Sequence, residues 1–507
     1  MNLGYLITRS SRYFPDRRAF VIDGQAISYR SLNRKINKVA NALLSLGLKK
    51  GGRVGLLFHN SLAYLESHLA LYKAGLVWVR LNARLAANEI KGMIEDSGAL
   101  ALIHGPEFLE TAQKVSSGIR WLIQKGGGPG IDYDDFLGKG SEHEPEVDVF
   151  LDDLSDLWYT SGTTGAPKGI MLTHRNILTC TQLLLSEVYD ITQGDKFLTP
   201  GALSHAGSVR ILPFIIRGAT CHLHGHFDPE GIFEEIEKSR ITDLATVPTI
   251  LIALMDHPKR PHFDLSPLKR ITYAGSPMPV ERIKEALELF GPVLDQSYGQ
   301  AESIITITHL SRQEHLLNDD PARERRFSSA GREYPGVQVR IVDDHDHFLG
   351  PGELGEVVTR SDLVMRGYWN QPEKTQEALR GGWLHTGDIG YLDEDGYLFL
   401  VDRKHDKIIT GGLNVYPREV EEVICAHQAV AQVAVFGAKD PFWGEAVTAA
   451  VVARRGMSVT AEELTEFCKG RLAGYKRPKK IYFLDDLPKN LYGKVMRKEL
   501  KKQFEGQ

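Results

Sequence analysis

The segment YTSGTTGAPKG, residues 159–169, combines glycines and small hydroxyl residues with a single lysine. Glycines let a chain turn tightly enough for successive N–H groups to converge on an anion, and hydroxyls and a lysine add further donors. The spacing differs from that of the common nucleotide-binding loop, because Lys168 follows Pro167 and precedes Gly169. We therefore expect a phosphate-binding loop of another kind, and a plain surface turn is the alternative.

Four further motifs follow in order: SYGQAE at 297–302, WLHTGD at 383–388, DRKHDKIITGGLNVYP at 402–417 and PKNLYGKVMRK at 488–498. With the first segment they resemble the adenylate-forming acyl-CoA synthetases, whose relatives include luciferases and the adenylation domains of peptide synthetases. The resemblance covers essentially the whole chain, and five motifs in register make it specific. It departs at Ala301, where the family usually has threonine, so one hydroxyl contact near the phosphates is expected to be missing or replaced.

The resemblance implies a reaction in two halves. A carboxylate attacks the α-phosphate of ATP, which gives an acyl-adenylate and pyrophosphate, and a thiol then displaces AMP. Lys494 would touch both the carboxylate and the α-phosphate, although a solvated lysine is the ordinary alternative. Glu302 would bind Mg²⁺, a hard cation that prefers oxygen ligands. His205 would lie beside the substrate carboxylate, and a packing histidine is the alternative there.

The resemblance also implies the nucleotide-binding residues. Tyr298 would lie against the adenine. Asp388 and Arg403 would bind the ribose, because a carboxylate can accept hydrogen bonds from two adjacent hydroxyls. The remaining positions implied to contact the nucleotide are Ser161, Gly162, Thr163, Thr164, Gly165, Lys168, Gly275, Ser276, Pro277 and Gly299.

The expected class of substrate follows from the absence of an acidic side chain at the start of the substrate pocket. Relatives that activate amino acids place an aspartate at the start of the pocket to pair with the ammonium group, and His205 takes that position here. Residues 203–212 contain no acidic side chain. A buried ammonium without a partner is costly, so we expect a fatty or aryl carboxylic acid without an α-amino group.

Coenzyme A is the expected acceptor, since no carrier domain follows the Lys494 motif. Trp443 and Arg477 match positions that contact CoA in the family, and Gly411 and Gly412 would line the passage for pantetheine, where only glycine lets a ligand approach the backbone so closely. A solvated basic patch is the alternative for the segment KRPKK, residues 476–480, which contains Arg477.

Two other functions stay open: an enzyme that loads a carrier protein, and a non-catalytic nucleotide sensor.

Helical and strand patterns alternate up to about residue 300. Apolar residues recur at helical spacing in residues 31–47, with Ser31 as the expected N-cap and Gly47 as the expected stop. GGRVGLLF, residues 51–58, is typical of a buried strand. Such alternation predicts an α/β fold with mostly parallel sheets covered by helices.

The pattern changes towards the C-terminus. Residues 335–400 indicate antiparallel hairpins. A compact α+β unit follows, with one helix starting near Pro417 and another capped by Thr460. We predict a large adenylation domain over residues 1–402 and a small C-terminal domain over residues 403–507 that carries the catalytic lysine.

The small domain is expected to swing. Lys494 serves the first half-reaction and the Gly411–Gly412 passage the second, so both must reach one reaction centre. In the family, the pivot lies two positions after the motif arginine, which is His405 here. Relatives usually have Asp or Lys there, so a salt-bridging role is in doubt.

Three histidines, His222, His224 and His226, alternate in CHLHGHF. On a strand they would share one face and could bind zinc, but a solvated strand face is favoured because no acidic or cysteine partner occurs at that spacing. The segment DDHDH, residues 343–347, is interpreted as a charged hairpin tip.

Bulk composition sets limits on the class of protein. With 42% hydrophobic and 25% charged residues, the 507-residue chain has the balance of a globular protein. The net charge of −4 gives no reason to expect nucleic acid as a partner. We see no signal peptide and no transmembrane segment, and the four cysteines are scattered, so a cytoplasmic location is expected. Peripheral membrane contact and a homodimer are left open.

Overall fold

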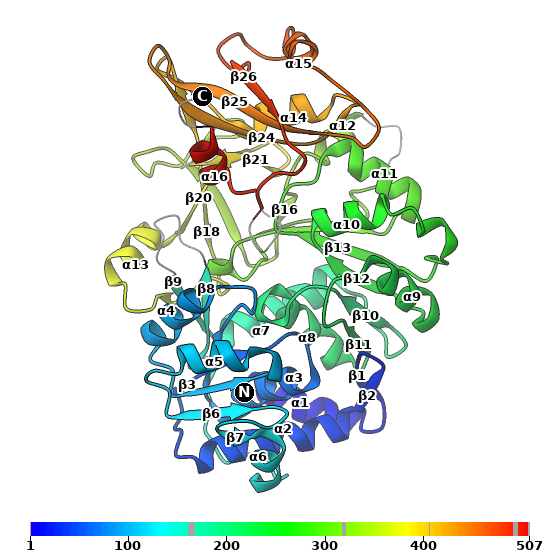
Figure 1. Cartoon of the computed structure of the whole chain (residues 1–507), viewed down its shortest axis with the longest axis vertical. Coiled ribbons are helices and arrows are strands. Elements are labelled where there is room, and N and C mark those ends of the chain that lie inside the picture. Colours follow the sequence, from blue (N-terminus) through cyan, green and yellow to red (C-terminus); the bar gives the residue numbers. More distant parts are fainter. Residues whose placement is uncertain (1, 161–167, 317–320, 405, 490–494, 505–507) are drawn as a thin grey trace.

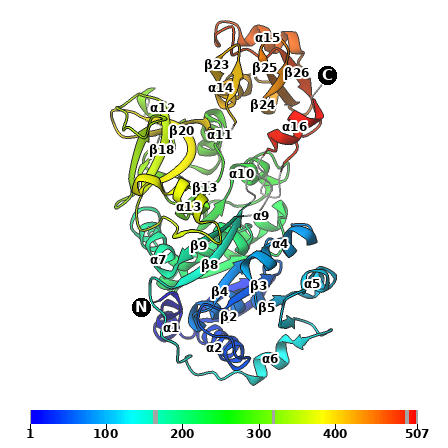
Figure 2. The ribbon, with the colours of Figure 1, turned by 90° about the vertical axis from the view of Figure 1, so that its left-hand side faces the viewer.

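Four β-sheets and their covering helices build the described part of the chain. The computed structural model describes residues 2–160, 168–316, 321–404, 406–489 and 495–504. In Figure 1, the two large sheets occupy the blue to green part of the molecule, and the orange and red C-terminal part lies at the opposite end. Figure 2 shows the same separation from the side.

The nine-stranded sheet has the strand order β16-β15-β14-β13-β12-β10-β11-β1-β2. Its strands are β1 (Arg18–Ile22), β2 (Gln25–Ser28), β10 (Lys196–Thr199), β11 (Thr220–Leu223), β12 (Asp243–Thr246), β13 (Arg270–Ala274), β14 (Leu294–Tyr298), β15 (Thr308–Leu310) and β16 (Arg332–Glu333). From β1 through β11, β10, β12 and β13 to β14, neighbouring strands are parallel. Their C-terminal ends therefore lie at one edge, where ligands bind in open α/β sheets.

The eight-stranded sheet has the order β19-β9-β8-β4-β3-β5-β6-β7. Its strands are β3 (Arg53–Leu57), β4 (Val77–Arg80), β5 (Ala101–His104), β6 (Trp121–Gln124), β7 (Ile131–Asp132), β8 (Leu154–Thr160), β9 (Lys168–Thr173) and β19 (Gly367–Tyr368). Strands β8 and β9 pair antiparallel on either side of the phosphate-loop segment, and β19 adds to β9 from far along the chain.

Helices cover both faces of these two sheets. Their bounds are α1 (Leu3–Tyr13), α2 (Tyr29–Ser45), α3 (Leu62–Ala74), α4 (Ala87–Ser97), α5 (Leu109–Val115), α6 (Tyr133–Lys139), α7 (His174–Leu183), α8 (Ser208–Arg217), α9 (Pro229–Ser239), α10 (Pro248–Met255), α11 (Val280–Phe290), α12 (Pro321–Arg326) and α13 (Pro372–Ala378). Helices α1, α2, α3, α7 and α8 share one apolar core with both sheets. Helices α9 to α11 cover the outer face of the nine-stranded sheet, and α4 and α5 that of the eight-stranded sheet.

Five layers result, alternating helices and sheets, and the central layer holds the largest core. Strands such as β4 are buried along their whole length, as expected for parallel strands covered on both faces. Within the described residues, no helix combines the length and the apolar run that crossing a lipid bilayer requires.

The C-terminal third contains two smaller sheets. The strands of the four-stranded sheet are β17 (Gln338–Val342), β18 (Gly355–Arg360), β20 (Leu384–Leu392) and β21 (Leu398–Arg403), and those of the five-stranded sheet are β22 (Ile408–Thr410), β23 (Leu413–Val415), β24 (Val430–Asp440), β25 (Gly444–Ala453) and β26 (Lys480–Phe483). The predicted antiparallel hairpins over 335–400 are confirmed. Helices α14 (Pro417–Cys425), α15 (Ala461–Cys468) and α16 (Arg497–Gln503) pack on the five-stranded sheet.

The helix ends agree with the caps predicted from the sequence, with one exception. Thr460 and Glu463 form the expected capping box of α15. The N-cap of α2 is Ser28, whose side chain accepts from the Ser31 N–H, so the prediction of Ser31 as the cap is wrong. The backbone carbonyls of Arg17 and Pro15 accept hydrogen bonds from the N–H groups of Tyr29 and Arg30. The helix therefore begins before Ser31. Gly47, with φ of 86°, ends that helix as predicted.

Candidate active site

Asp388 is the centre of a polar cluster at the C-terminal end of β14. Its carboxylate lies 3.1 Å from Arg403 Nε across the β20–β21 ladder. The same carboxylate accepts hydrogen bonds from the Tyr298 hydroxyl at 2.5 Å and from Gln300 Nε2 at 2.7 Å. Burial raises the pKa of Tyr298 well above its usual value, and Asp388 raises it further, so the hydroxyl stays protonated and donates. The structure thus brings together the expected adenine and ribose residues.

Glu302 and Lys168 meet at a residue that the sequence did not single out, Tyr368. The Tyr368 hydroxyl donates to Glu302 Oε1 at 3.0 Å, and the Lys168 ammonium lies 5.0 Å from the centre of the Tyr368 ring. Strand β19 positions the tyrosine, because Tyr368 pairs with Ile170 next to the phosphate-loop segment. The expected metal-binding carboxylate and the loop lysine therefore share one tyrosine as their neighbour.

Two glycines line this edge of the sheet for different reasons. A Cβ on Gly299 would collide with the backbone of Ile305. Gly275 follows β13 with φ of 94°, a conformation that favours glycine. Ser276 and Pro277 continue from Gly275 along the exposed rim of this edge.

His205 lies in a short π-helical turn, Leu203–Gly207, directly before α8. Its carbonyl accepts a hydrogen bond from Arg80 at 3.2 Å, and its ring stands edge-on to Trp158 with centroids 6.2 Å apart. Burial, together with the nearby cations Arg80 and Arg84, lowers the pKa of His205 to about 3. The imidazole is therefore neutral near pH 7 and can donate or accept a hydrogen bond without carrying charge.

Several predicted site residues lie outside the described residues. They are Ser161, Gly162, Thr163, Thr164 and Gly165 of the phosphate loop, the pivot His405, and Lys494. Their roles stay predictions.

The two glycines predicted to line the CoA passage form the turn of the β22–β23 hairpin. Gly411 and Gly412 connect Thr410 to its partner Leu413 and have φ of 55° and 81°, the geometry of a two-residue type I′ turn. A Cβ on Gly411 would lie 3.1 Å from the Trp443 ring, so the predicted passage residues are neighbours.

Lys479 is a basic residue beside Trp443, and the predicted contact of Arg477 with CoA stays a prediction. The Lys479 ammonium lies 4.9 Å from the Trp443 ring, whereas Arg477 Nε donates to the Leu472 carbonyl at 2.9 Å. In the printed sequence Lys479 lies in the same KRPKK segment, and nothing in the pattern of that segment distinguishes it from its neighbours.

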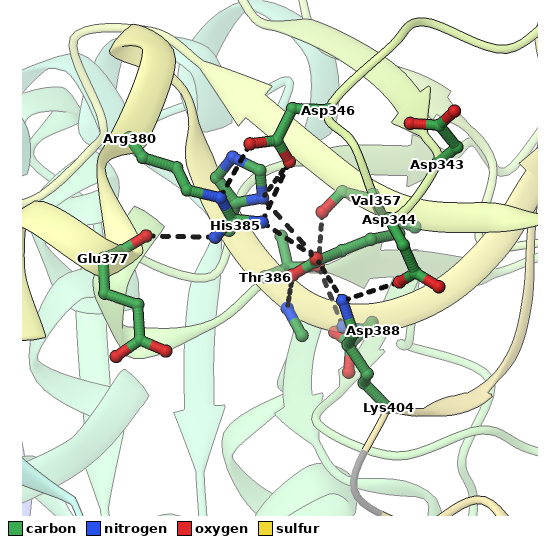
Figure 3. Close-up of polar contacts among 12 residues, drawn as sticks. Asp343, Asp344, Asp346, Val357, Glu377, Arg380, His385, Thr386, Asp388 and Lys404 are labelled. Atoms are coloured by element: carbon green, nitrogen blue, oxygen red, sulfur yellow. Dashed lines mark hydrogen bonds and ion pairs between the residues drawn. The ribbon is translucent and has the colours of Figure 1, made fainter.

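A charged cluster flanks the expected pivot on the side of the large domain. Lys404 Nζ lies 3.2 Å from Asp344 and 3.3 Å from Glu356, and Arg380 lies 2.9 Å from Asp346. Figure 3 shows Lys404 pointing toward Asp344, with Arg380 and His385 gathered around Asp346. The DDHDH segment lies in the turn between β17 and β18, as predicted, and one of its aspartates, Asp344, also contacts Lys404 next to position 405.

The interpretation of the three histidines as a solvated strand face is wrong. Strand β11 ends at Leu223, so only His222 belongs to it, and that side chain is buried. Glu235 of α9 lies 2.8 Å from His222 and 3.8 Å from His224, which supplies the acidic partner missed in the sequence. These residues line a pocket of about 310 Å³. His226 is exposed.

The oxygen chemistry of Glu302 fits a magnesium ion shared with phosphates. In the described part of the chain, no group of three or more His, Cys, Asp or Glu side chains could hold a metal. Mg²⁺ usually takes only one or two carboxylates and completes its shell with water and substrate phosphates. A single carboxylate, Glu302, that accepts from the neutral Tyr368 hydroxyl is consistent with that pattern.

Comparisons with known proteins identify the family. The chain matches the AMP-binding enzyme family over residues 7–369 and the C-terminal domain of AMP-binding enzymes over residues 419–494. It is 37% identical over 505 residues to a feruloyl-CoA synthase of an Amycolatopsis species, with 99% of each chain covered. It is 33% identical over 521 residues to the medium/long-chain-fatty-acid–CoA ligase FadD8 of Mycobacterium tuberculosis, with 99% of this chain and 90% of that one covered.

A solved structure agrees with these matches. The amide bond synthetase McbA from Marinactinospora thermotolerans superposes with a TM-score of 0.90 at 30% identity, with 99% of this chain and 100% of that chain covered. The protein belongs to the AMP-binding enzyme family, the adenylate-forming acyl-CoA synthetases. The resemblance in the sequence and the predicted fold class are confirmed.

Proposed function

We propose that the protein is an ATP-dependent acid–CoA ligase that activates a fatty or aryl carboxylate as acyl-AMP and transfers the acyl group to coenzyme A. The observation that carries the proposal is that the segment 298–302, at the end of β14, contacts both Asp388 and the Tyr368–Lys168 pair. The family matches support the same chemistry.

In the first half-reaction, an oxygen of the substrate carboxylate attacks the α-phosphorus of ATP, and the bond to the pyrophosphate oxygen breaks. Asp388 accepts from the ribose hydroxyls, which requires it to exchange part of its present contacts with Tyr298 and Gln300. The Tyr298 ring packs against the adenine. Lys168 and the hydroxyls of its loop hold the phosphates, and His205 orients the carboxylate as a neutral donor.

Charge on the α-phosphate needs stabilisation as it develops, since two anions meet in this step. Lys494 supplies a cation that touches both the carboxylate and the α-phosphate. Glu302 would hold Mg²⁺, which screens the phosphate charges when bound. Tyr368 keeps the Glu302 carboxylate in place by its hydrogen bond.

In the second half-reaction, the CoA thiolate attacks the acyl carbonyl carbon, and the bond to AMP breaks. The Gly411–Gly412 turn gives pantetheine a path along the backbone, and Trp443 forms its wall. Lys479, with Arg477 nearby in sequence, provides positive charge for the nucleotide end of CoA. The small domain, residues 403–507, turns about His405 between the two steps.

AMP release measures the proposed function directly. Purified protein is incubated with ATP, Mg²⁺ and a panel of acids from acetate to palmitate plus benzoates, with CoA, with a carrier protein, or with neither. We expect AMP and acyl-CoA to form only in the reactions that contain CoA. Transfer to the carrier protein instead would favour the carrier-loading alternative, and no AMP with any acid would leave only a nucleotide-binding role.

Lys494→Ala adds a test within the reaction. We expect it to lower pyrophosphate exchange by about 10²-fold or more while sparing thioester formation from supplied acyl-adenylate. Equal loss of both activities would contradict the role given to Lys494.

A further inference from the structure

Arg80 and Asp156 form a buried ion pair between neighbouring strands of the eight-stranded sheet. Arg80 ends β4, and Asp156 lies on the adjacent strand β8. Asp156 Oδ1 lies 2.8 Å from Arg80 Nε and 2.7 Å from Arg80 Nη2, and both side chains are fully buried. Replacing a buried ion pair by apolar residues of similar volume is often neutral or stabilising, so stability alone is a weak reason for this pair. The contacts of the remaining nitrogen, Nη1, indicate a second role.

Nη1 of Arg80 contacts the turn that carries His205. It donates to the His205 carbonyl at 3.2 Å and to Ser208 Oγ at 3.0 Å. The Ser208 hydroxyl in turn donates to the same carbonyl at 2.9 Å. These bonds connect the eight-stranded sheet to the turn before α8, and Arg80 and His205 are 125 residues apart in the chain. The sheet thus holds the backbone of His205 from outside its own segment.

The turn interrupts helical geometry at His205. This residue has φ of −122° and ψ of −146°, whereas Gly207 and Ser208, which follow it, have helical angles. A helix fixes its peptide planes through repeated backbone hydrogen bonds, so the orientation of a non-helical residue depends more on contacts with side chains. Arg80 and Ser208 supply such contacts to the His205 carbonyl.

Arg80 also supports the surroundings of the His205 ring. The guanidinium carbon lies 4.2 Å from the centre of the Trp78 ring and 4.3 Å from that of the Trp158 ring, distances at which cation–π attraction acts. Trp158 stands edge-on to the imidazole, with centroids 6.2 Å apart. Loss of Arg80 would therefore disturb both the carbonyl of His205 and the indole beside its ring.

We propose that Arg80 is a positioning residue for the first half-reaction: backed by Asp156, it fixes His205 so that the imidazole meets the substrate carboxylate. This inference rests on the proposed function, which places His205 beside that carboxylate. Arg80 is fully buried, so its effect on the substrate passes through His205. The planar guanidinium suits this role, because its fork holds the aspartate and the carbonyl in fixed directions at once. A misplacement of about 1 Å can lower a rate by about 10²-fold.

A double-mutant cycle on the full-length enzyme tests whether Arg80 acts through His205. Arg80→Met, His205→Ala and the double variant are compared with wild type in acid-dependent pyrophosphate exchange, with the acid that the wild type uses best among acetate to palmitate and the benzoates. We expect each single variant to lower kcat/KM for the acid by about 10²-fold, with KM for ATP near wild type. The double variant should also lose about 10²-fold, whereas independent effects would multiply to about 10⁴-fold.

A multiplicative loss would overturn the inference, because a residue that only supports the fold lowers activity whether or not His205 is present. A wild-type kcat/KM for the acid in either single variant would overturn it as well. Thermal unfolding of each variant records the change in stability separately.

Arg270 provides a matched control. It is also a buried arginine that pairs with an aspartate, Asp243, at 2.7 Å. It begins β13, at the opposite end of that strand from Gly275. Arg270→Met therefore removes a buried ion pair without touching the His205 turn, and any loss of kcat/KM should be equal with and without His205→Ala. A loss that disappears in the His205→Ala background would mean that loosening of the core, not Arg80, explains the coupling.

Should Arg80→Met not fold, Ser208→Ala takes its place in the cycle. The alanine removes the hydroxyl that contacts both Arg80 and the His205 carbonyl, and it leaves the ion pair with Asp156 in place. We expect a fall of about fivefold in kcat/KM for the acid that disappears in the His205→Ala background. An equal fall in both backgrounds would overturn the inference.

The outcomes also separate the two proposals. Wild-type protein that shows no pyrophosphate exchange with any acid contradicts the proposed function. Active wild-type protein in which Arg80 and His205 act independently contradicts only the role of Arg80.

Discussion

Tyr368 connects the carboxylate and the lysine that are proposed to handle the phosphates. Its hydroxyl holds Glu302, and its ring lies below the Lys168 ammonium. The two contacts use different parts of one side chain, so a single substitution can separate them. Phenylalanine keeps the ring and removes only the hydrogen bond to the carboxylate.

We expect Tyr368→Phe to raise the Mg²⁺ concentration needed for half-maximal pyrophosphate exchange by about tenfold, because a freed carboxylate loses its fixed orientation. Titration of Mg²⁺ at saturating ATP measures this shift. Tyr391→Phe on β20 serves as a control, since that tyrosine stacks on Phe399 away from Glu302. An unchanged Mg²⁺ requirement in Tyr368→Phe would show that Glu302 is not the metal ligand.

At the scale of elements, the β22–β23 hairpin presents its turn to Trp443. Gly411→Ala puts a methyl group 3.1 Å from the indole and strains a left-handed residue. We expect CoA-dependent thioester formation to fall by about tenfold or more, with pyrophosphate exchange near wild type, because the turn serves only the second step.

Gly456→Ala is the matched control for that strain. Gly456 lies in the same domain with φ of 80°, and nothing lies within 4 Å of an added Cβ. Its thioester formation should match wild type. If the two alanine variants behave alike, strain in the small domain explains the loss and the passage lies elsewhere.

The turn between β17 and β18 and the strands β18 and β20 form a charged cluster around Glu356 that contributes to stability. Burial would raise the pKa of this carboxyl, but His385 and Lys404 outweigh burial and hold the pKa at about 2. The unfolded chain binds its proton near pH 4.3, so the stabilisation is complete above that pH and is lost as the pH falls towards 2.

Glu356→Gln is therefore expected to lower the free energy of unfolding by about 3 kcal/mol at pH 7, with less than half of that difference left at pH 3. Urea unfolding at both pH values measures the change. Glu394→Gln, an exposed position in the β20–β21 turn, should have little effect at either pH. A difference that does not depend on pH would mean that packing, not charge, accounts for the role of Glu356.

At the scale of the whole molecule, the chain on either side of position 405 is tied to a different domain. Lys404 contacts Asp344 and Glu356 of the large domain, and Asp406 accepts from Arg497 of the small domain at 3.1 Å. Strand β21 ends at Arg403 in one sheet and β22 begins at Ile408 in another. These anchors support a pivot between them.

Proline at position 405 would restrict φ to about −65° and obstruct rotation. In His405→Pro we expect pyrophosphate exchange to persist and acyl-CoA formation to fall by about tenfold or more, while His405→Ala retains both. Separate assays of the two half-reactions decide the point. If the proline variant loses both activities, or loses neither, the pivot lies elsewhere.

Much of the fold was predictable because its determinants are local. Parallel strands are short apolar runs, helix ends carry caps such as Thr460 with Glu463, and the Gly411–Gly412 turn follows from residue type. The motifs also named Tyr298, Asp388 and Glu302 as site residues. These features depend on residue type and on short spacings along the chain, so they can be predicted without knowing the tertiary structure.

Tertiary structure alone decided which distant groups meet. Tyr368 reaches Glu302 only because β19 joins β9, and Glu235 reaches His222 only because α9 packs beside β11. The order of strands in the sheets and the packing of helices determine these contacts, and they cannot be predicted from local sequence patterns.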